Sequence, residues 1–164
     1  MIRTSLLAAA LLALIVAAAP AMAAPTKGAQ LPAFTLNLLQ HRFGDQTYAP
    51  TRVPSGYRYS RWQKVNDNLV LTFKERTSTD SFRFEVSKLA PAAPCDGGGA
   101  FHRIIQTDGN KIYYGGDKGY WKAWRCVVSP KTQTSYVLTV LSNGKLSDIA
   151  LAQISASGKR FAKP

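Results

Sequence analysis

The sequence is poor in the residues that most often carry chemistry. Its 164 residues include two cysteines, two histidines and nine acidic residues. No Gly-x-Ser-x-Gly, His-Glu-x-x-His or Cys-x-x-Cys motif occurs, so no known signature of a nucleophile, a zinc site or a redox dithiol is present. Glycine and proline, at 12 and 9 residues, are too few for a low-complexity or collagen-like chain. We therefore expect no catalytic residue, no metal and no cofactor.

Long apolar runs are also absent, with one exception near the start of the chain. Residues 6–19 form an unbroken apolar run after the positive Arg3, and Ala21-Met22-Ala23 supplies the small residues of a signal peptidase site. The run is shorter than the roughly 20 residues that span a bilayer. We predict a signal peptide over residues 1–23, cleaved near Ala23, and a secreted or periplasmic mature chain. A retained membrane anchor is the alternative.

Apolar residues make up 46% of the chain, which excludes an intrinsically disordered protein. The length fits one domain. We predict a flexible leader over residues 24–32, a single domain over 33–158 and a basic tail over 159–164.

Acidic residues are outnumbered by 21 lysines and arginines, which gives a formal net charge of +12. Signal cleavage removes only Arg3 from this set. Such an excess favours polyanionic partners. For an exported chain these are anionic lipids, acidic wall polymers, glycans or extracellular DNA, and not cytosolic nucleic acid. The alternative is that the charge serves only solubility.

The two cysteines, Cys95 and Cys126, enclose a loop of about 30 residues. In an oxidising compartment a lone pair is expected to form a disulfide. Closing such a loop stabilises a fold by roughly 3–4 kcal/mol in the chain-entropy model.

Apolar residues alternate with polar ones after Gly56, which predicts β-strands. The expected strands cover residues 57–65, 69–76, 82–87, 103–107, 111–115, 120–128 and 135–141. Asp108-Gly109-Asn110 and Gly115–Gly119 are expected to be turns.

Helices are expected at both ends of these strands. Residues 34–43 suit a short helix that Gly44 ends, and Ser147 caps a second helix that stops at Gly158. The apolar stripe of the second helix comprises Leu146, Ala150 and Ile154, with Ile149 beside it. The predicted fold is α+β: an antiparallel meander of about seven strands, covered on its inner face by the C-terminal helix.

Strict alternation places basic residues on the outer face of this sheet. The residues predicted to bind a polyanion are Arg58, Lys64, Lys74, Arg76, Arg83 and Lys122. The strand over 120–128 has basic residues on both faces, so alternation alone does not place Lys122 or Arg125. Trp62, Tyr113 and Trp121 are expected among these cations, where aromatic rings would stack or insert. The alternative is a solvated face that prevents aggregation.

Two other functions remain open at this stage. Glu75 and Glu85 lie on neighbouring strands, and with His102 they could form an envelope hydrolase. Glu85 beside Arg83 is more simply explained as a cross-strand ion pair. A large apolar inner face under one helix could instead carry an apolar ligand, although such a face is usually core.

Residues 49–157 resemble a small bacterial extracytoplasmic domain of unknown function, found in secreted proteins and on the outer side of some anti-sigma-factor proteins. The resemblance lies in the Pro-rich lead at 50–57, Trp124, Tyr136-Val137-Leu138 and the closing helix at 146–157. It implies a curved sheet with a helix on it and supplies no catalytic residues. Unlike the anti-sigma members, this chain is not expected to carry a cytoplasmic sigma-binding region. We therefore predict an exported, non-enzymatic binding module, with an anionic envelope component or an envelope protein as its partner.

Overall fold

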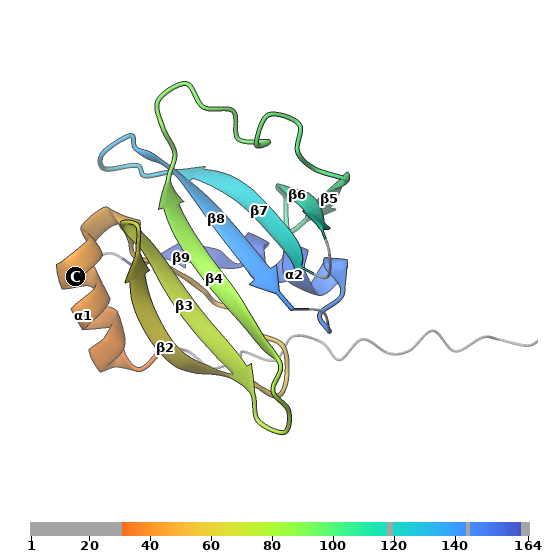
Figure 1. Ribbon diagram of the computed structural model, residues 1–164. Helices are drawn as coiled ribbons and strands as arrows, with labels where there is room; N and C mark the ends of the chain where they lie inside the picture. Colours follow the sequence, from red (N-terminus) through yellow and green to blue (C-terminus); the bar gives the residue numbers. More distant parts are fainter. Residues whose placement is uncertain (1–30, 118–119, 144, 162–164) are drawn as a thin grey trace, which may run out of the picture.

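Seven antiparallel strands form one sheet in the computed structural model, which describes residues 31–117, 120–143 and 145–161 (Figure 1). The strands are β2 (Tyr57–Val65), β3 (Asn68–Glu75), β4 (Ser81–Lys88), β5 (Arg103–Thr107), β6 (Asn110–Asp117), β7 (Tyr120–Val128) and β8 (Ser135–Ser142). The predicted signal peptide and nearly all of the predicted leader lie outside the described residues.

The strand order is β2-β3-β4-β8-β7-β6-β5, so the predicted single meander is wrong. The connection over residues 89–102 carries the chain from β4 to the far edge of the sheet. A second meander then returns, and its last strand, β8, pairs with β4. The sheet is therefore two antiparallel meanders joined edge to edge.

Two short helices, one 3-10 turn and a two-stranded ribbon accompany this sheet. The elements are α1 (Ala33–Phe43), the 3-10 turn η1 (Gly44–Gln46), β1 (Tyr48–Pro50), α2 (Asp148–Ala156) and β9 (Gly158–Arg160). The predictions of a short N-terminal helix, a C-terminal helix and an α+β fold are confirmed.

The chain after α2 is not a tail where the structure describes it. Lys159 and Arg160 belong to β9, which pairs with β1, and the Phe161 N–H donates to the Thr47 carbonyl at 2.9 Å. Leu31, which was expected in the flexible leader, is buried. Residues 162–164 lie outside the described residues.

The tight turns follow the turn chemistry of the sequence at two places and depart from it at one. Asn66 and Asp67, and likewise Asp108 and Gly109, have positive φ angles, as hairpin turns with the right-handed strand twist require. The predicted turn at Gly115–Gly119 is wrong at its start, because Gly115 and Gly116 continue β6 and pair with β7.

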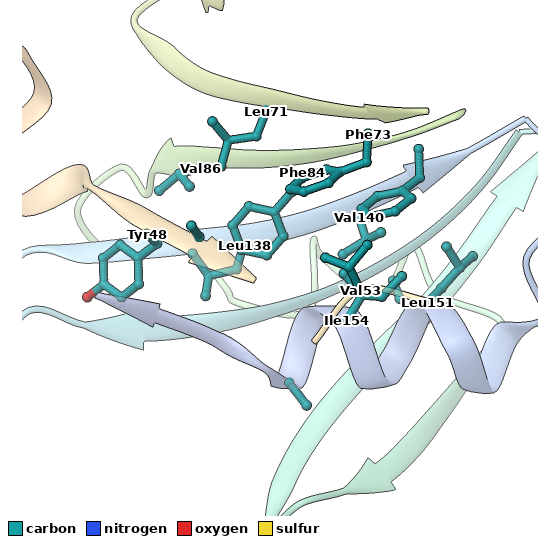
Figure 2. Close-up of a cluster of buried hydrophobic side chains, with 14 of the residues drawn as sticks. Tyr48, Val53, Leu71, Phe73, Phe84, Val86, Leu138, Val140, Leu151 and Ile154 are labelled. Atoms are coloured by element: carbon teal, nitrogen blue, oxygen red, sulfur yellow. The ribbon is translucent and has the colours of Figure 1, made fainter. Parts of the chain in front are cut away.

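The core lies between the inner face of the sheet and the elements that cover it (Figure 2). Phe73 and Phe82 stack at 4.7 Å between ring centroids. The ribbon comes so close that a Cβ atom on Gly158 would lie 2.8 Å from Leu138 Cδ1 and 2.9 Å from Phe84 Cζ, so only glycine fits there without repacking. Burial raises the pKa of Tyr57, which lines this core.

Helix α2 covers the inner face of β5–β8, as predicted (Figure 1). The Ser147 hydroxyl accepts a hydrogen bond from the Ala150 N–H, which confirms the predicted N-cap. The predicted apolar stripe is right in part: Ile154 is buried and Leu146 packs against the core, whereas Ile149 is 44% exposed and the buried Leu151 was not predicted. The helix is apolar on most sides, so its sequence pattern does not single out the buried face.

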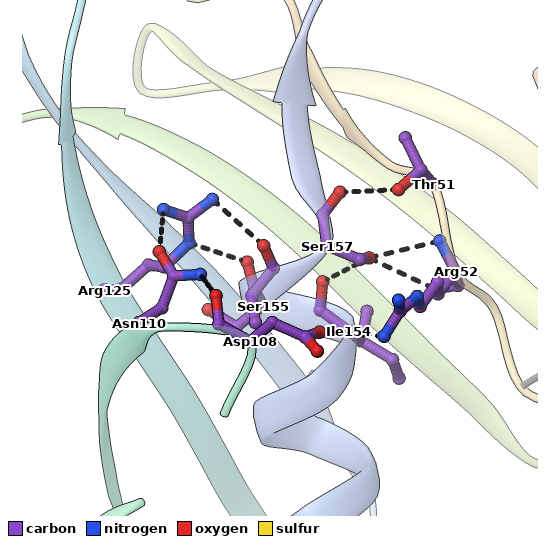
Figure 3. A network of polar contacts seen from close by, with 9 residues as sticks. Thr51, Arg52, Asp108, Asn110, Arg125, Ile154, Ser155 and Ser157 are labelled. Atoms are coloured by element: carbon purple, nitrogen blue, oxygen red, sulfur yellow. Dashed lines mark hydrogen bonds and ion pairs between the residues drawn. The ribbon is translucent and has the colours of Figure 1, made fainter. Parts of the chain in front are cut away.

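A half-buried arginine holds the C-terminal end of α2 (Figure 3). From the inner face of β7, Arg125 donates to the carbonyls of Ser155, Ala156 and Gly158 at 2.9, 3.2 and 2.8 Å, and to Asn110 Oδ1 at 3.0 Å. Burial lowers the pKa of the Arg125 guanidinium. The last carbonyls of a helix lack backbone partners and carry partial negative charge, so the guanidinium satisfies them and complements the helix dipole.

The predicted disulfide between Cys95 and Cys126 is confirmed. It ties the connection 89–102 to the outer face of β7, where Trp124 Nε1 also donates to the Cys95 carbonyl at 3.1 Å. Farther along the connection, the Phe101 ring lies 5.1 Å from the ring of Tyr113 on β6. The connection therefore covers the outer face of β6 and β7.

Candidate functional site

Basic side chains stand in register across the outer face, the face of the sheet turned away from α2. The pairing runs from Arg61 on β2 to Thr72 on β3, then to Arg83 on β4, Leu141 on β8 and Lys122 on β7. Neighbouring strands lie about 4.8 Å apart, so successive cations are about 10 Å apart at the backbone. We name Arg61, Arg83 and Lys122 the cation row.

Two further cations flank this row. Arg58 and Lys74 are direct cross-strand partners on β2 and β3, and both are exposed. Like charges directly opposite one another destabilise a sheet. Arg76, also predicted for this face, is exposed just beyond the end of β3 and outside the paired register.

A β-bulge in β2 corrects one predicted residue and adds another. The register shifts between Tyr59 and Arg61, so Arg61 points outward and Lys64 pairs with Leu69 on the inner side. Lys64 instead forms an ion pair with Asp67 at 2.6 Å. The prediction of Lys64 on the basic outer face is therefore wrong, and sequence reasoning missed Arg61.

The same bulge turns Trp62 inward, where its ring meets Phe43 edge-on at 6.0 Å between centroids. Strict alternation would have exposed this tryptophan and put the Arg61 charge in the core. That conflict within one short strand is the signal that could have revealed the bulge.

Carboxylates do not neutralise the outer-face cations. The described residues form five ion pairs: Arg52–Asp108, Lys64–Asp67, Arg103–Asp148, Lys145–Asp80 and Arg160–Asp45. None of them involves Arg58, Arg61, Lys74, Arg83 or Lys122. The predicted ion pair between Arg83 and Glu85 is also not formed, since Glu85 Oε1 accepts hydrogen bonds from Asn68 at 2.7 Å and Ser87 at 3.1 Å. The face keeps its positive charge.

A hollow of about 350 Å³ lies at the β7 end of the cation row. We name it the β6–β7 hollow. Its lining residues are Ala100, His102, Gly116, Tyr120, Trp121, Lys122 and Leu141. His102 Nε2 lies 2.9 Å from the Gly116 carbonyl oxygen, which fixes one wall to β6. Two of the lining residues, Lys122 and Leu141, stand in the paired register of the row, so hollow and row are continuous.

The other two aromatic residues predicted among these cations, Tyr113 and Trp121, are not freely accessible to a ligand on the outer face. Tyr113 stands on the outer face but stacks on Trp124 at 5.9 Å between centroids, and Trp124 is 5% exposed. Lys122 Nζ lies over the Trp124 ring at 4.8 Å from its centroid. The prediction of Trp121 among the outer-face cations is wrong, because Trp121 pairs with Ser142 on the inner side of the sheet and its ring stacks on Tyr114.

The three residues of the hydrolase alternative are not brought together. Glu75 pairs with Tyr57, whereas Glu85 pairs with Val70, five positions along β3 and therefore about 17 Å away. His102 precedes β5 at the opposite edge of the sheet. Within the described ranges, no group of three or more His, Cys, Asp or Glu residues is placed to hold a metal ion.

The inner face is filled by the core described above. Two spaces remain on this side: an open hollow of about 490 Å³ bordered by Phe43, Trp62 and the charged Arg42, Lys64 and Asp67, and a cavity of about 150 Å³ between the start of α1, β1 and Phe161. Ligand pockets usually measure about 300–1,000 Å³, so this cavity is small for an acyl chain.

Comparisons with family models, curated proteins and solved structures found no match to this chain. None of the helices in the part of the chain that the structure describes has the length and apolarity to cross a membrane.

Proposed function

We propose that the protein is an exported, non-enzymatic binding module whose outer sheet face holds an anionic polymer of the cell envelope or exterior. One observation carries this proposal: the cation row and its neighbours Arg58 and Lys74 are not paired with any carboxylate of the described residues. A polyanion would relieve the repulsion between Arg58 and Lys74 and release its own counterions.

The spread of these cations across the sheet suits an extended polymer better than a small ligand. The row crosses five adjacent strands, from β2 to β7. Because the paired backbone fixes these cations relative to one another, binding costs little backbone ordering. The signal peptide predicted at residues 1–23 would deliver this face to envelope polymers, and the disulfide fits an oxidising compartment.

Reversing two charges of the row tests this proposal. Residues 24–164 are expected to bind dextran sulfate, and Arg61→Glu with Arg83→Glu should weaken that binding at least about tenfold. The matched control is Lys131→Glu with Lys159→Glu, which makes the same change in net charge at exposed lysines of the β7–β8 turn and β9. Affinity can be measured by calorimetry.

The control distinguishes a specific binding site on the outer face from general electrostatic attraction of a polyanion to a basic protein. Equal losses in both double variants would contradict a specific outer-face site. Binding to anionic vesicles but not to dextran sulfate would favour a lipid surface, and binding to neither would favour a protein partner.

A further inference from the structure

Two aromatic rings lie side by side on the outer face of β6 and β7. Tyr113 and Trp124 are direct cross-strand partners, and their rings stack at 5.9 Å between centroids. Lys111 Nζ lies 5.1 Å from the centroid of the Tyr113 ring, and Lys122 Nζ lies 4.8 Å from that of Trp124. We name these four residues the ring platform. Because Lys122 also belongs to the cation row, the platform continues the row toward β6.

The connection between β4 and β5, green in Figure 1, covers this platform at Trp124. We name its residues 90–100 the cover. Trp124 Nε1 donates to the Cys95 carbonyl at 3.1 Å, and a Cβ atom on Gly97 would lie 3.8 Å from Trp124 Cζ2. Trp124 keeps only 5% of its surface exposed. A polyanion on the cation row therefore cannot stack a ring on Trp124 while the cover is in place.

The two ends of the cover are fixed to the sheet independently of the disulfide. Just before it, the Leu89 N–H donates to the Ser135 carbonyl at 2.9 Å. Just after it, the His102 N–H donates to the Tyr114 carbonyl at 2.8 Å. Displacing the cover therefore does not require either neighbouring strand to leave the sheet.

Between these ends, the cover depends on the Cys95–Cys126 bond. Among the described residues, the backbone hydrogen bonds that the cover donates come from Ala93 and Gly97 and stay within the cover. Residues 97–99 are three glycines with positive φ angles, and most of the cover is exposed. Ordering such a segment costs conformational entropy, for glycine most of all. Without the cross-link, few contacts oppose its release.

We propose that residues 90–100 are a redox-controlled cover, and that reduction of the Cys95–Cys126 bond opens Trp124 to the planar rings of a polyanion held on the cation row. This inference rests on the proposed function and adds the regulation of the same face. Both cysteines are half-buried and lie outside the core.

A dithiol is the class of reductant that this step needs. Its thiolate attacks one cysteine sulfur, the protein S–S bond breaks, and a mixed disulfide forms. The second thiol of the reductant then displaces the bound cysteine. The protein gains two electrons and two protons as two thiols, and the reductant leaves as a disulfide.

The test compares two polyanions in both redox states. Poly(dT) carries a base on every charged unit, whereas dextran sulfate carries charge without aromatic rings. Reduction of residues 24–164 by dithiothreitol is expected to strengthen poly(dT) binding about tenfold, the gain typical of one stacking ring. Dextran sulfate binding should stay within about twofold, and reoxidation should reverse the gain. Trp124→Leu should abolish the gain, whereas the matched control Trp121→Leu, on the inner side, should keep it.

Tryptophan fluorescence follows the cover without a ligand. Quenching by acrylamide should rise when the wild type is reduced, and it should not rise in Trp124→Leu. Unchanged quenching in the wild type overturns the cover, and so does loss of dextran sulfate binding on reduction, which would mean that the sheet itself unfolds. Increased quenching with unchanged poly(dT) affinity, or an equal gain on both polymers, overturns the ring platform. If the oxidised wild type binds no dextran sulfate, the proposed function fails, whereas the quenching still tests the cover.

Discussion

Replacing Arg125 by methionine is expected to lower the free energy of unfolding by about 3–4 kcal/mol, because a hydrogen bond to a charged group contributes about 1.5–3 kcal/mol and this side chain makes several. The variant keeps the apolar stem but leaves the Ser155, Ala156 and Gly158 carbonyls without their donor. Urea unfolding followed by circular dichroism measures the change.

The matched control for this prediction is Arg58→Met. Arg58 is exposed on the outer face and makes no ion pair with a described residue, so its replacement should change the free energy of unfolding by less than about 0.5 kcal/mol. A loss at Arg125 no larger than the loss at Arg58 would show that the α2 terminus does not depend on the guanidinium.

Replacing both Cys95 and Cys126 by alanine is expected to lower the free energy of unfolding by about 3–4 kcal/mol in the chain-entropy model. The bond closes a loop between residues 31 apart in sequence. The double variant should unfold at lower urea concentration than the oxidised wild type, and a reducing agent should shift the wild type but not the variant. A wild type that is as stable reduced as oxidised would contradict this account.

The disulfide also bears on the β6–β7 hollow. Ala100 and His102, which form one wall, belong to the connection that Cys95 ties to β7. Its rupture should therefore free this wall of the hollow from β7.

Much of the sheet could be predicted from the sequence, because apolar and polar residues alternate along its strands. The bounds of β2, β5 and β7 agree with alternation bordered by turn residues such as Asp67 and Asp108. Strand order could not be predicted, since alternation specifies faces and not partners. Strand β9 is only three residues long, too short for any period to show, so Lys159 and Arg160 looked like a tail.

The candidate site was predicted in part, and its errors have physical causes. Arg58, Lys74 and Arg83 lie on the outer face because alternation holds at these positions, whereas Lys122 is placed there by strand pairing, which alternation alone did not settle. The bulge at Tyr59/Arg61 reversed the remainder of β2. The hollow depends on the approach of residues 100–102 to β6, a contact between distant segments that no local pattern records.

The central claim is that the outer sheet face binds a polyanion and is not a catalytic site. The salt dependence of that binding is the most direct test of the claim. Each cation that a flexible polyanion neutralises adds about −0.7 to the slope of log K against log salt concentration. The three cations of the row and their two neighbours predict a slope between about −2 and −4 for residues 24–164 on dextran sulfate. Arg61→Gln with Arg83→Gln should make the slope shallower by about 1.4. Binding that is insensitive to salt, or an unchanged slope in this variant, would contradict the claim.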